Sequence, residues 1–301
     1  MKNVLITCGT GLVGTDLLKQ FVSENYKVYA IVRKEASFNR DNLIWIKKDF
    51  EEIDSHFLRD LSNIDIVIHA GALINEDGSI SDFKNFRVIN MEFSEKLFYW
   101  CSNLKNYPTV IYISSLSFIQ KPLSGIITES SPLAPISLYG ISKYWGELTL
   151  FSYAKSGAYR PVALRLSSPI TFNLKLLHNT VVKKWIDNCL KKEKIHVYGK
   201  GIREQDFVST LDITQAVFKI IQNVNIQGVY NIASGNTISM IELAGLISKR
   251  FSVKFDFIGK DINEKDKWLV SIEKAKKDFD YRPTYTSTKV IKKLLDTIVC
   301  D

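Results

Sequence analysis

The sequence predicts an α/β fold in which a doubly wound parallel sheet is joined by a smaller, interleaved α/β lobe towards the C-terminus. Short runs rich in Val and Ile alternate with segments of helical periodicity through the first half of the chain. A glycine-rich turn directly follows the first run, and the alternation becomes irregular after residue 168. Alternation of this kind places successive strands in parallel, with helices covering both faces of the sheet.

The elements of the sheet are expected in chain order. The main strands are short apolar runs, expected at 3–7, 27–32, 64–70, 109–115 and 161–167. Amphipathic helices are expected between them, at 13–26, at 93–106 and from Tyr139 onwards. We therefore assign residues to two domains by the following ranges: a sheet domain of 1–168, to which 206–233 is expected to return, and a lobe of 169–205 and 234–301.

The chain of 301 residues is basic, with a formal net charge of +8 and a pI near 9.1. Such a balance can indicate nucleic-acid binding. In the stretch 181–195, however, Val182, Trp185 and Ile186 share one helical side and the lysines lie mostly on the other. Solvated helix faces are thus the favoured interpretation, and we expect no nucleic-acid partner. A mild positive field would still attract a phosphate-bearing small molecule.

Targeting and redox features are sparse. The chain has no long uncharged apolar run, and its first apolar run, which starts at Val4, continues into glycines. We expect no signal peptide, no membrane association and a cytoplasmic location. The four histidines are scattered, and Cys8, Cys101, Cys189 and Cys300 have no paired spacing. Neither a disulfide framework nor a metal site is expected.

A glycine pattern follows the first expected strand, in the stretch VLITCGTGLVG. Gly9, Gly11 and Gly14 form G-x-G-x-x-G between a strand and a helix, with Leu12 and Val13 inside it. Glycines permit a tight turn and close approach of phosphate, and the helix N-terminus offers free N–H groups to an anion. A plain tight turn is the alternative. The position of the pattern favours a Rossmann-type domain that binds a dinucleotide.

Residues after the next strands bear on the choice of dinucleotide. A carboxylate at the end of the second strand favours NAD, whereas this chain has Arg33 and Lys34, whose charges suit the 2′-phosphate of NADP. NADP is therefore the preferred cofactor; with NAD, the alternative, Arg33 would stack on adenine or face solvent. Asp49, followed by Phe50, comes after LIWIKK and could accept from the adenine amino group. Its alternative role is a helix N-cap.

Tyr139 and Lys143 are four residues apart in an expected helix and so share one helical face. An ammonium beside a phenol lowers the pKa of the phenol, which could then exchange a proton with an alcohol or carbonyl oxygen. A surface pair is the alternative. Ser114, Ser115 and Ser117 favour a site, because they end a strand and ligands gather at the carboxyl ends of parallel strands. We expect two of these serines to do no more than cap the strand end.

Together these stretches resemble the NAD-dependent epimerase/dehydratase family, in the extended branch of the short-chain dehydrogenase/reductase superfamily. The family's motifs follow in order: TCGTGLVG resembles its glycine turn, IVIHAGAL its H-x-A-A segment, VINMEFSEKLF a helix that carries an Asn, VIYISSLSFI the strand with the active serine, and PLAPISLYGISK its P-x-x-x-Y-x-x-S-K stretch. The later stretches VYGKGIREQDFVSTLDITQAV, GVYNIASGNTISMIELA and KAKKDFDYRPTY resemble the C-terminal signatures of the branch.

The resemblance implies roles for individual residues. Tyr139 would be the general acid/base, Lys143 would lower its pKa and bind the nicotinamide ribose, and Ser115 would orient the reacting oxygen. Hydride would pass between a sugar carbon and the nicotinamide. Many relatives pair through a four-helix interface, so a homodimer is expected. Further cofactor contacts are implied for Ala70, Gly71, Ala72, Asn90 and Pro169.

Departures from the family pattern lie mainly in the substrate half. Cys8 occupies the first glycine of the family's turn. Ser168 replaces an Asn that helps to hold the substrate diphosphate, and Gln205 stands where an arginine often binds the nucleotide phosphate. Because Arg203 lies two residues before that position, we expect it to take over the phosphate contact. Ser117 and Ser168 are the other expected substrate contacts.

The first functional hypothesis is an NAD(P)-dependent enzyme that acts on a nucleotide-linked sugar as a 4-epimerase or a 4-ketoreductase. A dehydratase is disfavoured, because Leu116 and Ser117 follow the active serine where that chemistry usually needs an ionisable pair. One alternative is an NADPH-dependent reductase of a free carbonyl compound. Another is a cofactor-binding sensor without turnover, against which the retained Ser115, Tyr139 and Lys143 argue.

Overall fold

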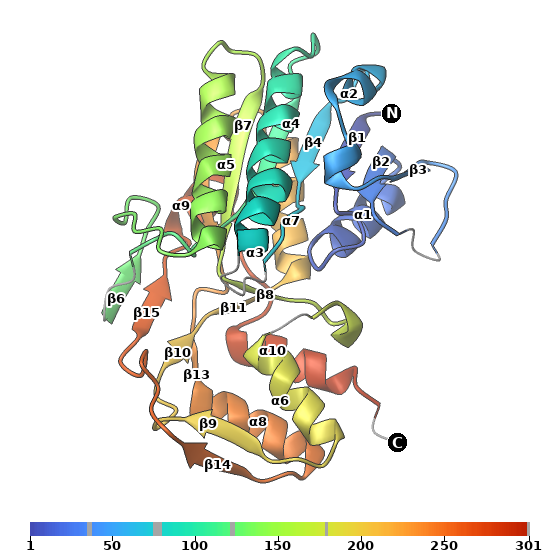
Figure 1. Cartoon of the computed structure of the whole chain (residues 1–301). Coiled ribbons are helices and arrows are strands. Elements are labelled where there is room, and N and C mark those ends of the chain that lie inside the picture. Colours follow the sequence, from blue (N-terminus) through green and yellow to red (C-terminus); the bar gives the residue numbers. More distant parts are fainter. Residues whose placement is uncertain (35–37, 75–79, 121–123, 178–179, 300–301) are drawn as a thin grey trace. The chain divides into compact units, whose positions relative to one another are not determined.

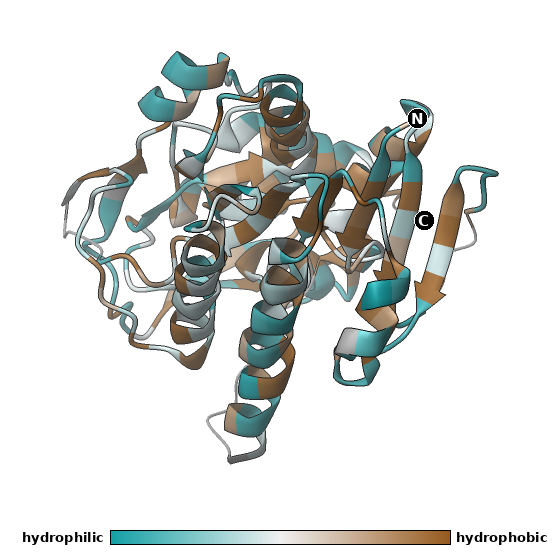
Figure 2. Cartoon of the chain, turned by 90° about the horizontal axis from the view of Figure 1, so that it is seen from above, coloured by the Kyte–Doolittle hydropathy of each residue, from teal (hydrophilic) through white to brown (hydrophobic). Residues whose placement is uncertain are grey.

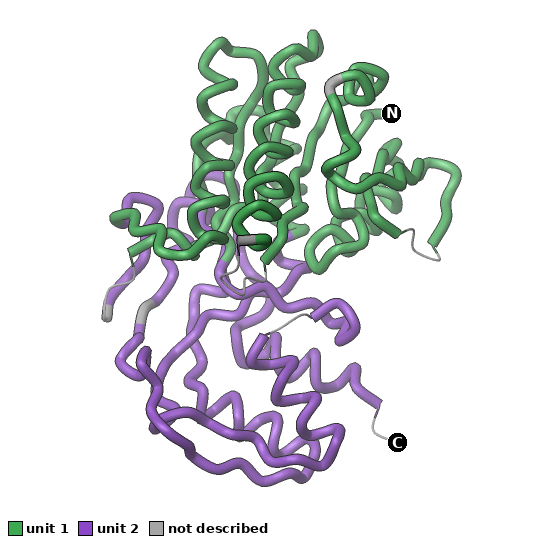
Figure 3. Tube along the Cα trace, viewed as in Figure 1, with its two compact units in different colours: residues 1–120, 132–166, 214–230 green, residues 121–131, 167–213, 231–301 purple. Residues whose placement is uncertain are grey.

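The computed structural model of the chain describes residues 1–34, 38–74, 80–120, 124–177 and 180–299. The chain forms two compact units, coloured separately in Figure 3. Unit 1 comprises 1–120, 132–166 and 214–230, and unit 2 comprises 121–131, 167–213 and 231–301. Each unit draws on separate stretches of the chain, so the two are interleaved in sequence.

Unit 1 is built on a seven-stranded sheet with the strand order β12-β7-β5-β4-β1-β2-β3 (Figure 1). The register is parallel for every pair from β7 across to β3. The predicted doubly wound parallel sheet is confirmed. Its strands are β1 (Asn3–Thr7), β2 (Lys27–Val32), β3 (Leu43–Lys47), β4 (Ile66–His69), β5 (Thr109–Ser115), β7 (Arg160–Leu166) and β12 (Gly228–Ile232).

Helices cover the sheet, and this explains why its central strands are apolar throughout and do not alternate. In β4 all four residues are buried, and Figure 2 shows the strands mostly in the hydrophobic colour. The helices α4 (Phe93–Ser102) and α5 (Leu138–Ala154) lie side by side in front of the sheet in Figure 1. Behind it, Phe218 of α7 (Thr210–Gln222) contacts Phe21 of α1 (Gly14–Ser23), with ring centres 4.5 Å apart.

Shorter helical elements connect the strands of unit 1. A 3₁₀ turn, η1, and the helices α2 and α3 precede a π-helix, η2, that leads directly into α4. Asp54 is the N-cap of α2 and accepts a hydrogen bond from the N–H of Phe57. The bounds are η1 (Phe50–Glu52), α2 (Ser55–Asp60), α3 (Ile80–Asn85) and η2 (Phe86–Glu92).

Unit 2 combines two-stranded pairs with helices. Three of the strand pairs among its described residues are parallel, β6 with β15, β8 with β11 and β9 with β14, and β10 with β13 is antiparallel. The strands are β6 (Ser124–Ile127), β8 (Ser168–Ile170), β9 (Ile195–Tyr198), β10 (Glu204–Gln205), β11 (Phe207–Ser209), β13 (Ile238–Ser239), β14 (Phe255–Ile258) and β15 (Lys267–Val270). The helical elements are η3 (Leu174–Leu176), α6 (Val181–Leu190), α8 (Met240–Phe251), α9 (Glu273–Phe279) and α10 (Ser287–Asp296).

Helix α6 has the amphipathic character that its sequence predicts. Val182, Trp185 and Ile186 are buried, whereas Lys184 and Lys191 are exposed. The lysines of this stretch therefore solvate a helix face. In the part of the chain that the structure describes, no helix is long and apolar enough to cross a membrane.

Candidate active site

Helix α5 carries Tyr139 in its first turn. Ser137 is the N-cap and accepts a hydrogen bond from the N–H of Gly140 at 3.0 Å, so the helix begins immediately before the tyrosine. The hydroxyl of Tyr139 is hydrogen-bonded to Ser115, at the end of β5. The Nζ atom of Lys143 lies 5.9 Å from the centre of the Tyr139 ring. The structure thus brings together the three residues that the sequence singled out.

Lys143 is buried, with 3% of its surface exposed. Its Nζ donates to the carbonyl oxygen of Ile113 at 2.7 Å and lies 4.7 Å from the centre of the Tyr112 ring. Burial lowers the pKa of Lys143 to about 7, against the opposing effects of Cys8 and Glu147. Near neutral pH this side chain can therefore gain or lose a proton readily.

The pKa of Tyr139 differs from the expectation drawn from the sequence. Although part of the residue is accessible, its hydroxyl lies deep, and burial raises the pKa of Tyr139 to about 12, with the hydrogen bond from Ser115 acting in the opposite direction. The expected lowering by Lys143 is thus wrong for this arrangement. Burial disfavours the phenolate directly. It also lowers the pKa of Lys143, so that the ammonium that would stabilise the phenolate is only partly formed near neutral pH.

A chain of buried polar groups runs beneath the site. The N–H groups of Ala70 and Gly71 both donate to Oγ1 of Thr7 at 3.1 Å, so this hydroxyl donates in turn to Nδ1 of His69 at 2.8 Å. The Nε2–H of His69 then donates to Oγ of Ser94 at 2.8 Å. Burial holds the pKa of His69 well below its usual range, with the Lys143 charge acting in the same direction. His69 is thus a neutral structural histidine.

Asn90 connects this chain to the helix that bears the tyrosine. Its side chain accepts from the N–H of Leu73 at 2.7 Å and donates to the carbonyl oxygen of the same residue at 2.9 Å. It also donates to Oγ of Ser142 at 3.0 Å, which donates to the carbonyl oxygen of Tyr139 at 2.9 Å. Asn90 therefore positions the loop after β4 and the first turn of α5.

The predicted glycine turn lies between β1 and α1. The N–H of Gly11 donates to the carbonyl oxygen of Cys8 at 2.9 Å, and a side chain at Gly14 would collide with that same oxygen. Cys8 itself has a φ of +58°, a left-handed conformation in which glycine would be favoured. No side chain caps the start of α1. The turn thus fits the phosphates of a dinucleotide, because no side chain caps the helix that follows it and its glycines leave the backbone open.

The other predicted cofactor residues take different positions. Arg33 and Lys34 are exposed after β2. Asp49 is the N-cap of η1, as in the alternative stated for it, and its N–H donates to Glu52 at 2.8 Å. The ring of Phe50 stacks on Phe93 with centres 4.1 Å apart. Gly71 and Val13 are buried, and the partly exposed positions are Leu12, Ala70, Ala72 and Pro169.

The candidate substrate residues divide between the two units. In unit 1, Oγ of Ser117 is buried and has no hydrogen-bond partner in the structure as described, which suits a group that binds a ligand. In unit 2, Oγ of Ser168 accepts from Nε2 of Gln205 at 2.5 Å. Nε of Arg203 lies 3.1 Å from a carboxylate oxygen of Asp261. To contact a phosphate, Ser168 would have to break its hydrogen bond with Gln205, and Arg203 its ion pair with Asp261.

Unit 2 contains a cavity of about 200 Å³. Aromatic and apolar walls come from Trp185, Tyr198 and Met240, and polar groups from His196, Arg203 and Asp261 are also part of its lining. The exposed His196 donates through Nδ1 to Asp256 at 2.6 Å. A flat ring with polar edges and an attached phosphate has the chemistry that such walls and such a guanidinium can hold.

Sequence reasoning missed several residues that organise the site. Thr7, His69 and Ser94 were not proposed, although the position of Thr7 and His69 at the ends of adjacent strands was a usable signal. Glu147, one helical turn beyond Lys143, was missed as well. Its partner Arg165 comes from β7, and that pairing could not be read from spacing along the chain.

Metal and disulfide chemistry have no counterpart among the described residues. No group of three or more metal-ligating side chains is found there, and the described cysteines Cys8, Cys101 and Cys189 are free. Cys300 lies outside the described residues.

Known proteins are similar to this chain in sequence and in fold. A model of the NAD dependent epimerase/dehydratase family matches residues 4–233. The dTDP-4-dehydro-6-deoxyglucose reductase of Escherichia coli is 22% identical over 99% of this chain and 98% of its own length. The dTDP-D-glucose 4,6-dehydratase of Dictyostelium discoideum is 27% identical over 81% of this chain and 61% of its own length. A structure of the UDP-glucuronic acid 4-epimerase from Bacillus cereus, in complex with UDP-glucuronic acid and NAD, aligns over 98% of each chain with a TM-score of 0.85 and 22% identity.

Proposed function

The chain belongs to the NAD dependent epimerase/dehydratase family, and from this premise we propose that it moves hydride to or from C4 of a nucleotide-linked sugar, as a 4-epimerase or a 4-ketoreductase. One observation carries the proposal: the hydroxyl groups of Ser115 and Tyr139 are hydrogen-bonded to each other with the Lys143 amine beside the phenol. Relatives named as a reductase and as a 4-epimerase of nucleotide sugars support the substrate class.

Each residue of the trio has a defined task in the proposed reduction. The hydroxyl of Ser115 donates to the sugar carbonyl oxygen and orients it. Tyr139 gives its proton to that oxygen as the adjacent carbon receives hydride, so that the carbonyl becomes an alcohol. A bound nicotinamide dinucleotide supplies the hydride and is oxidised. Lys143, with a pKa of about 7, can return a proton towards the resulting phenolate. Epimerisation begins with the reverse step, in which the C4 alcohol loses a proton and hydride to become a ketone. The keto sugar then rotates, and the reduction described above delivers hydride to its other face.

Dehydration is disfavoured by the residues after the active serine. A 4,6-dehydratase must remove a proton and expel water from neighbouring carbons, which requires ionisable groups near the sugar. The two positions that follow Ser115 are Leu116, which is buried, and Ser117. The two side chains cannot act as an acid–base pair, although several relatives are named as dehydratases.

For the cofactor, we propose NAD. The family's description and the B. cereus structure both name NAD, and the preference for NADP that we drew from Arg33 and Lys34 has no support in the comparisons. Fluorescence titration with NADH and NADPH tests this choice. We expect the native chain to bind NADH more tightly than NADPH, and Arg33→Ala to bind NADH with the same affinity as the native chain. Tighter binding of NADPH that is lost in Arg33→Ala would restore the original preference.

We propose that the cavity of unit 2 accepts the nucleotide part of the substrate, with Arg203 on a phosphate. Its aromatic lining favours a base ring. Ser168 and Gln205 are not part of this lining; they are polar groups elsewhere in unit 2 that can exchange their mutual hydrogen bond for one to the substrate. Isothermal titration with UDP and dTDP, and with glucose 1-phosphate as the control without a base, checks the assignment. Equal affinity for all three ligands would contradict it.

A homodimer is proposed from the outer faces of α4 and α5. Ile141, Trp145 and Leu148 follow the spacing of one helical face and are exposed, Leu148 by 46%, and Tyr99 of α4 is also exposed. A second copy of this chain that buried these side chains would form a four-helix contact. Light scattering after size exclusion tests it: the native chain should have twice the mass of the single chain, and Leu148→Lys should be monomeric.

The decisive experiment for the reaction is a panel of UDP- and dTDP-linked sugars and their 4-keto derivatives, incubated with the protein and NAD or NADH. Interconversion of sugars without net change of cofactor identifies a 4-epimerase, whereas oxidation of NADH identifies a 4-ketoreductase. Tyr139→Phe is the matched control and should lower turnover by a factor of about 10² to 10⁴. Undiminished turnover in this variant would refute the proposed mechanism.

Two other functions would give different results in the same panel. Oxidation of NADH by free aldehydes or ketones, with no response to any nucleotide sugar, would identify a reductase of non-nucleotide carbonyl compounds. Tight binding of cofactor without turnover of any compound would support a sensor.

A further inference from the structure

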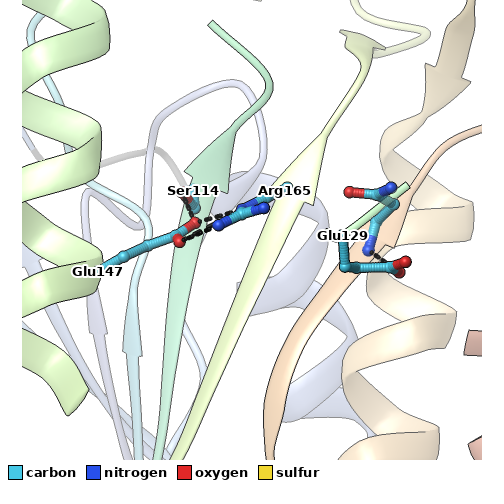
Figure 4. A network of polar contacts seen from close by, with 5 residues as sticks. Ser114, Glu129, Glu147 and Arg165 are labelled. Carbon is cyan, nitrogen blue, oxygen red and sulfur yellow. Dashed lines mark hydrogen bonds and ion pairs between the residues drawn. The ribbon is translucent and has the colours of Figure 1, made fainter. Parts of the chain in front are cut away.

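A buried ion pair lies one helical turn beyond Lys143. The carboxylate of Glu147 on α5 receives bonds from Arg165 on β7, from Nη2 at 2.8 Å and from Nε at 3.0 and 3.2 Å (Figure 4). Oγ of Ser114 on β5 donates to it at 2.6 Å. Only 4% of the Glu147 side chain and 7% of the Arg165 side chain are exposed. One carboxylate thus connects a helix to two strands.

The same carboxylate lies next to the candidate active site in the chain and in space. Ser114 directly precedes Ser115, and Glu147 follows Lys143 by four residues on one helical face. On the same helix, Gly146 allows α5 to contact Tyr112 of β5 closely, since a side chain at this position would collide with the hydroxyl of Tyr112. Helix α5 can therefore approach β5 closely, and the Glu147 pair holds it there.

We propose that Glu147 is a positioning residue for Tyr139 and Lys143, whose carboxylate, held by Arg165 and Ser114, keeps α5 against β5 and β7 and supplies the countercharge for the buried ammonium of Lys143. This inference rests on the proposed function, because it assigns Glu147 to the same site. Glu147 itself is not proposed as a catalytic residue: its carboxylate is bound by Ser114 and Arg165, and it acts through Lys143.

The charges around Lys143 favour this role. The titratable groups that face it are Tyr112 on β5, Cys8 in the turn after β1, His69 on β4, and Tyr139 and Glu147 on α5 itself. His69 is neutral, and burial raises the pKa of Tyr112 and of Cys8, so these groups carry no charge near neutral pH. Glu147 is the carboxylate of this set, and it raises the pKa of Lys143 against burial, as the thiol of Cys8 does only when it ionises.

Fold stability alone is a weak reason for such a pair. Two buried charges lose their hydration, and replacement of a buried ion pair by apolar side chains of similar volume is often neutral or stabilising. A purely structural pair could thus be replaced by packing. A pair that also sets the charge of Lys143 could not be replaced by apolar side chains without a change in the titration of Lys143, and this change can be measured.

The experiment follows the proton of Lys143 directly in the full chain, by NMR of lysines labelled at Nζ and Cε, with Lys143→Met to identify the signal. In Glu147→Gln the midpoint of the Lys143 titration should fall by about one pH unit, because a neighbouring negative charge has been removed. Glu147→Asp keeps the charge and should restore a midpoint near that of the native chain. No substrate is needed for this measurement.

Two further variants separate charge from packing. Leu150→Ala creates a cavity in the same helix without changing any charge, so it should lower stability and leave the Lys143 midpoint unmoved. Glu147→Leu combined with Arg165→Met replaces the pair by apolar side chains, so it should fold with nearly native stability and still show the lowered midpoint. This double variant also keeps the test valid if Glu147→Gln fails to fold.

The outcomes distinguish this inference from the proposed function. A midpoint in Glu147→Gln or in the double variant that moves no more than in Leu150→Ala would overturn the countercharge. With turnover established, Glu147→Gln should lower kcat about fivefold at pH 7 and about twofold at pH 6, because the protonated fraction of Lys143 falls accordingly. Undiminished turnover in Tyr139→Phe would instead refute the mechanism, whatever the titration of Lys143 shows.

Discussion

Unit 1 and unit 2 hold their candidate functional residues in different ways. In unit 1, Lys143 and His69 are buried. Lys143 donates to the carbonyl oxygen of Ile113, and both ring nitrogens of His69 are hydrogen-bonded, so burial and hydrogen bonds together fix their orientation. In unit 2, Arg203 has a partly exposed side chain that forms an ion pair with Asp261. The buried polar groups of unit 1 can be positioned accurately, whereas the polar groups of the unit 2 cavity can change partners when a ligand binds.

The departures from the family pattern follow the same division. Apart from Cys8, the glycine turn and the pair of Tyr139 and Lys143 resemble the family pattern, and Ser168 and Gln205 do not. A buried network loses stability when any member is left unpaired, which limits variation. Partly exposed groups can be exchanged at small cost, so the partly exposed polar residues of unit 2 can vary more readily than the buried ones of unit 1.

The largest expected effect concerns the buried charge of unit 1. Because the pKa of Lys143 is depressed to about 7 in the folded chain, the unfolded chain binds more protons between about pH 7 and 10.5. The contribution of Lys143 to stability therefore improves as pH rises through this window. Lys143→Met should be more stable than the native chain at pH 7, and this advantage should shrink by up to about 1.4 kcal/mol per pH unit. Urea unfolding from pH 7 to 10 measures it, and parallel curves would contradict it.

A second prediction asks whether burial or membership of a unit matters. Asp206 in unit 2 is 1% exposed and accepts from Ser167 and Ser234, the latter through both N–H and Oγ. In Asp206→Asn an amide N–H would face one of these donors. We therefore expect the free energy of unfolding, measured with urea, to fall by about 2–3 kcal/mol. Asp261→Asn, at a partly exposed ion pair, should lose less than about 1 kcal/mol. Equal losses of stability in the two variants would mean that burial does not explain the difference between the functional residues of the two units.

The partly exposed pair itself gives a third prediction. If Arg203 binds a substrate phosphate, Arg203→Ala should raise KM for the nucleotide sugar about tenfold and change kcat less than about twofold. Asp261→Asn should lower KM, because the guanidinium no longer has to leave its partner. Steady-state kinetics of both variants measure the effects. A rise in KM for both variants, or for neither, would refute the proposal that Arg203 leaves Asp261 to bind a substrate phosphate.

The smallest expected effect tests the departure within unit 1. Cys8 has a φ of +58°, a conformation that costs a residue with a side chain about 1 kcal/mol. Cys8→Gly should therefore raise stability by at most about 1 kcal/mol, offset in part by the greater entropy of the unfolded chain. The control is Asn25→Gly, at an exposed residue with a φ of +57°, because Asn tolerates this region better and its change should be smaller. Thermal unfolding compares them, and a destabilised Cys8→Gly would show that the thiol packing outweighs the strain.

Much of the fold could be predicted because its signals are local. The apolar runs that became β1 and β4, the glycine turn before α1 and the amphipathic period of α6 each lie within a few consecutive residues. The spacing of Tyr139 and Lys143 likewise identified one helical face. Asp49 was ambiguous for the same reason, since both of its stated roles were compatible with the local sequence, and the structure has it as the N-cap of η1.

The sequence by itself determined the strand–helix order, the glycine turn and the helical pairing of a phenol with an amine, since all three follow from spacing along the chain. Only the tertiary structure decided the electrostatics. The proton affinities of Tyr139 and Lys143 depend on burial, and the contact between Glu147 and Arg165 joins a helix to a strand that the chain reaches 18 residues later. Desolvation and long-range pairing arise from folding in three dimensions, so no local pattern could specify them.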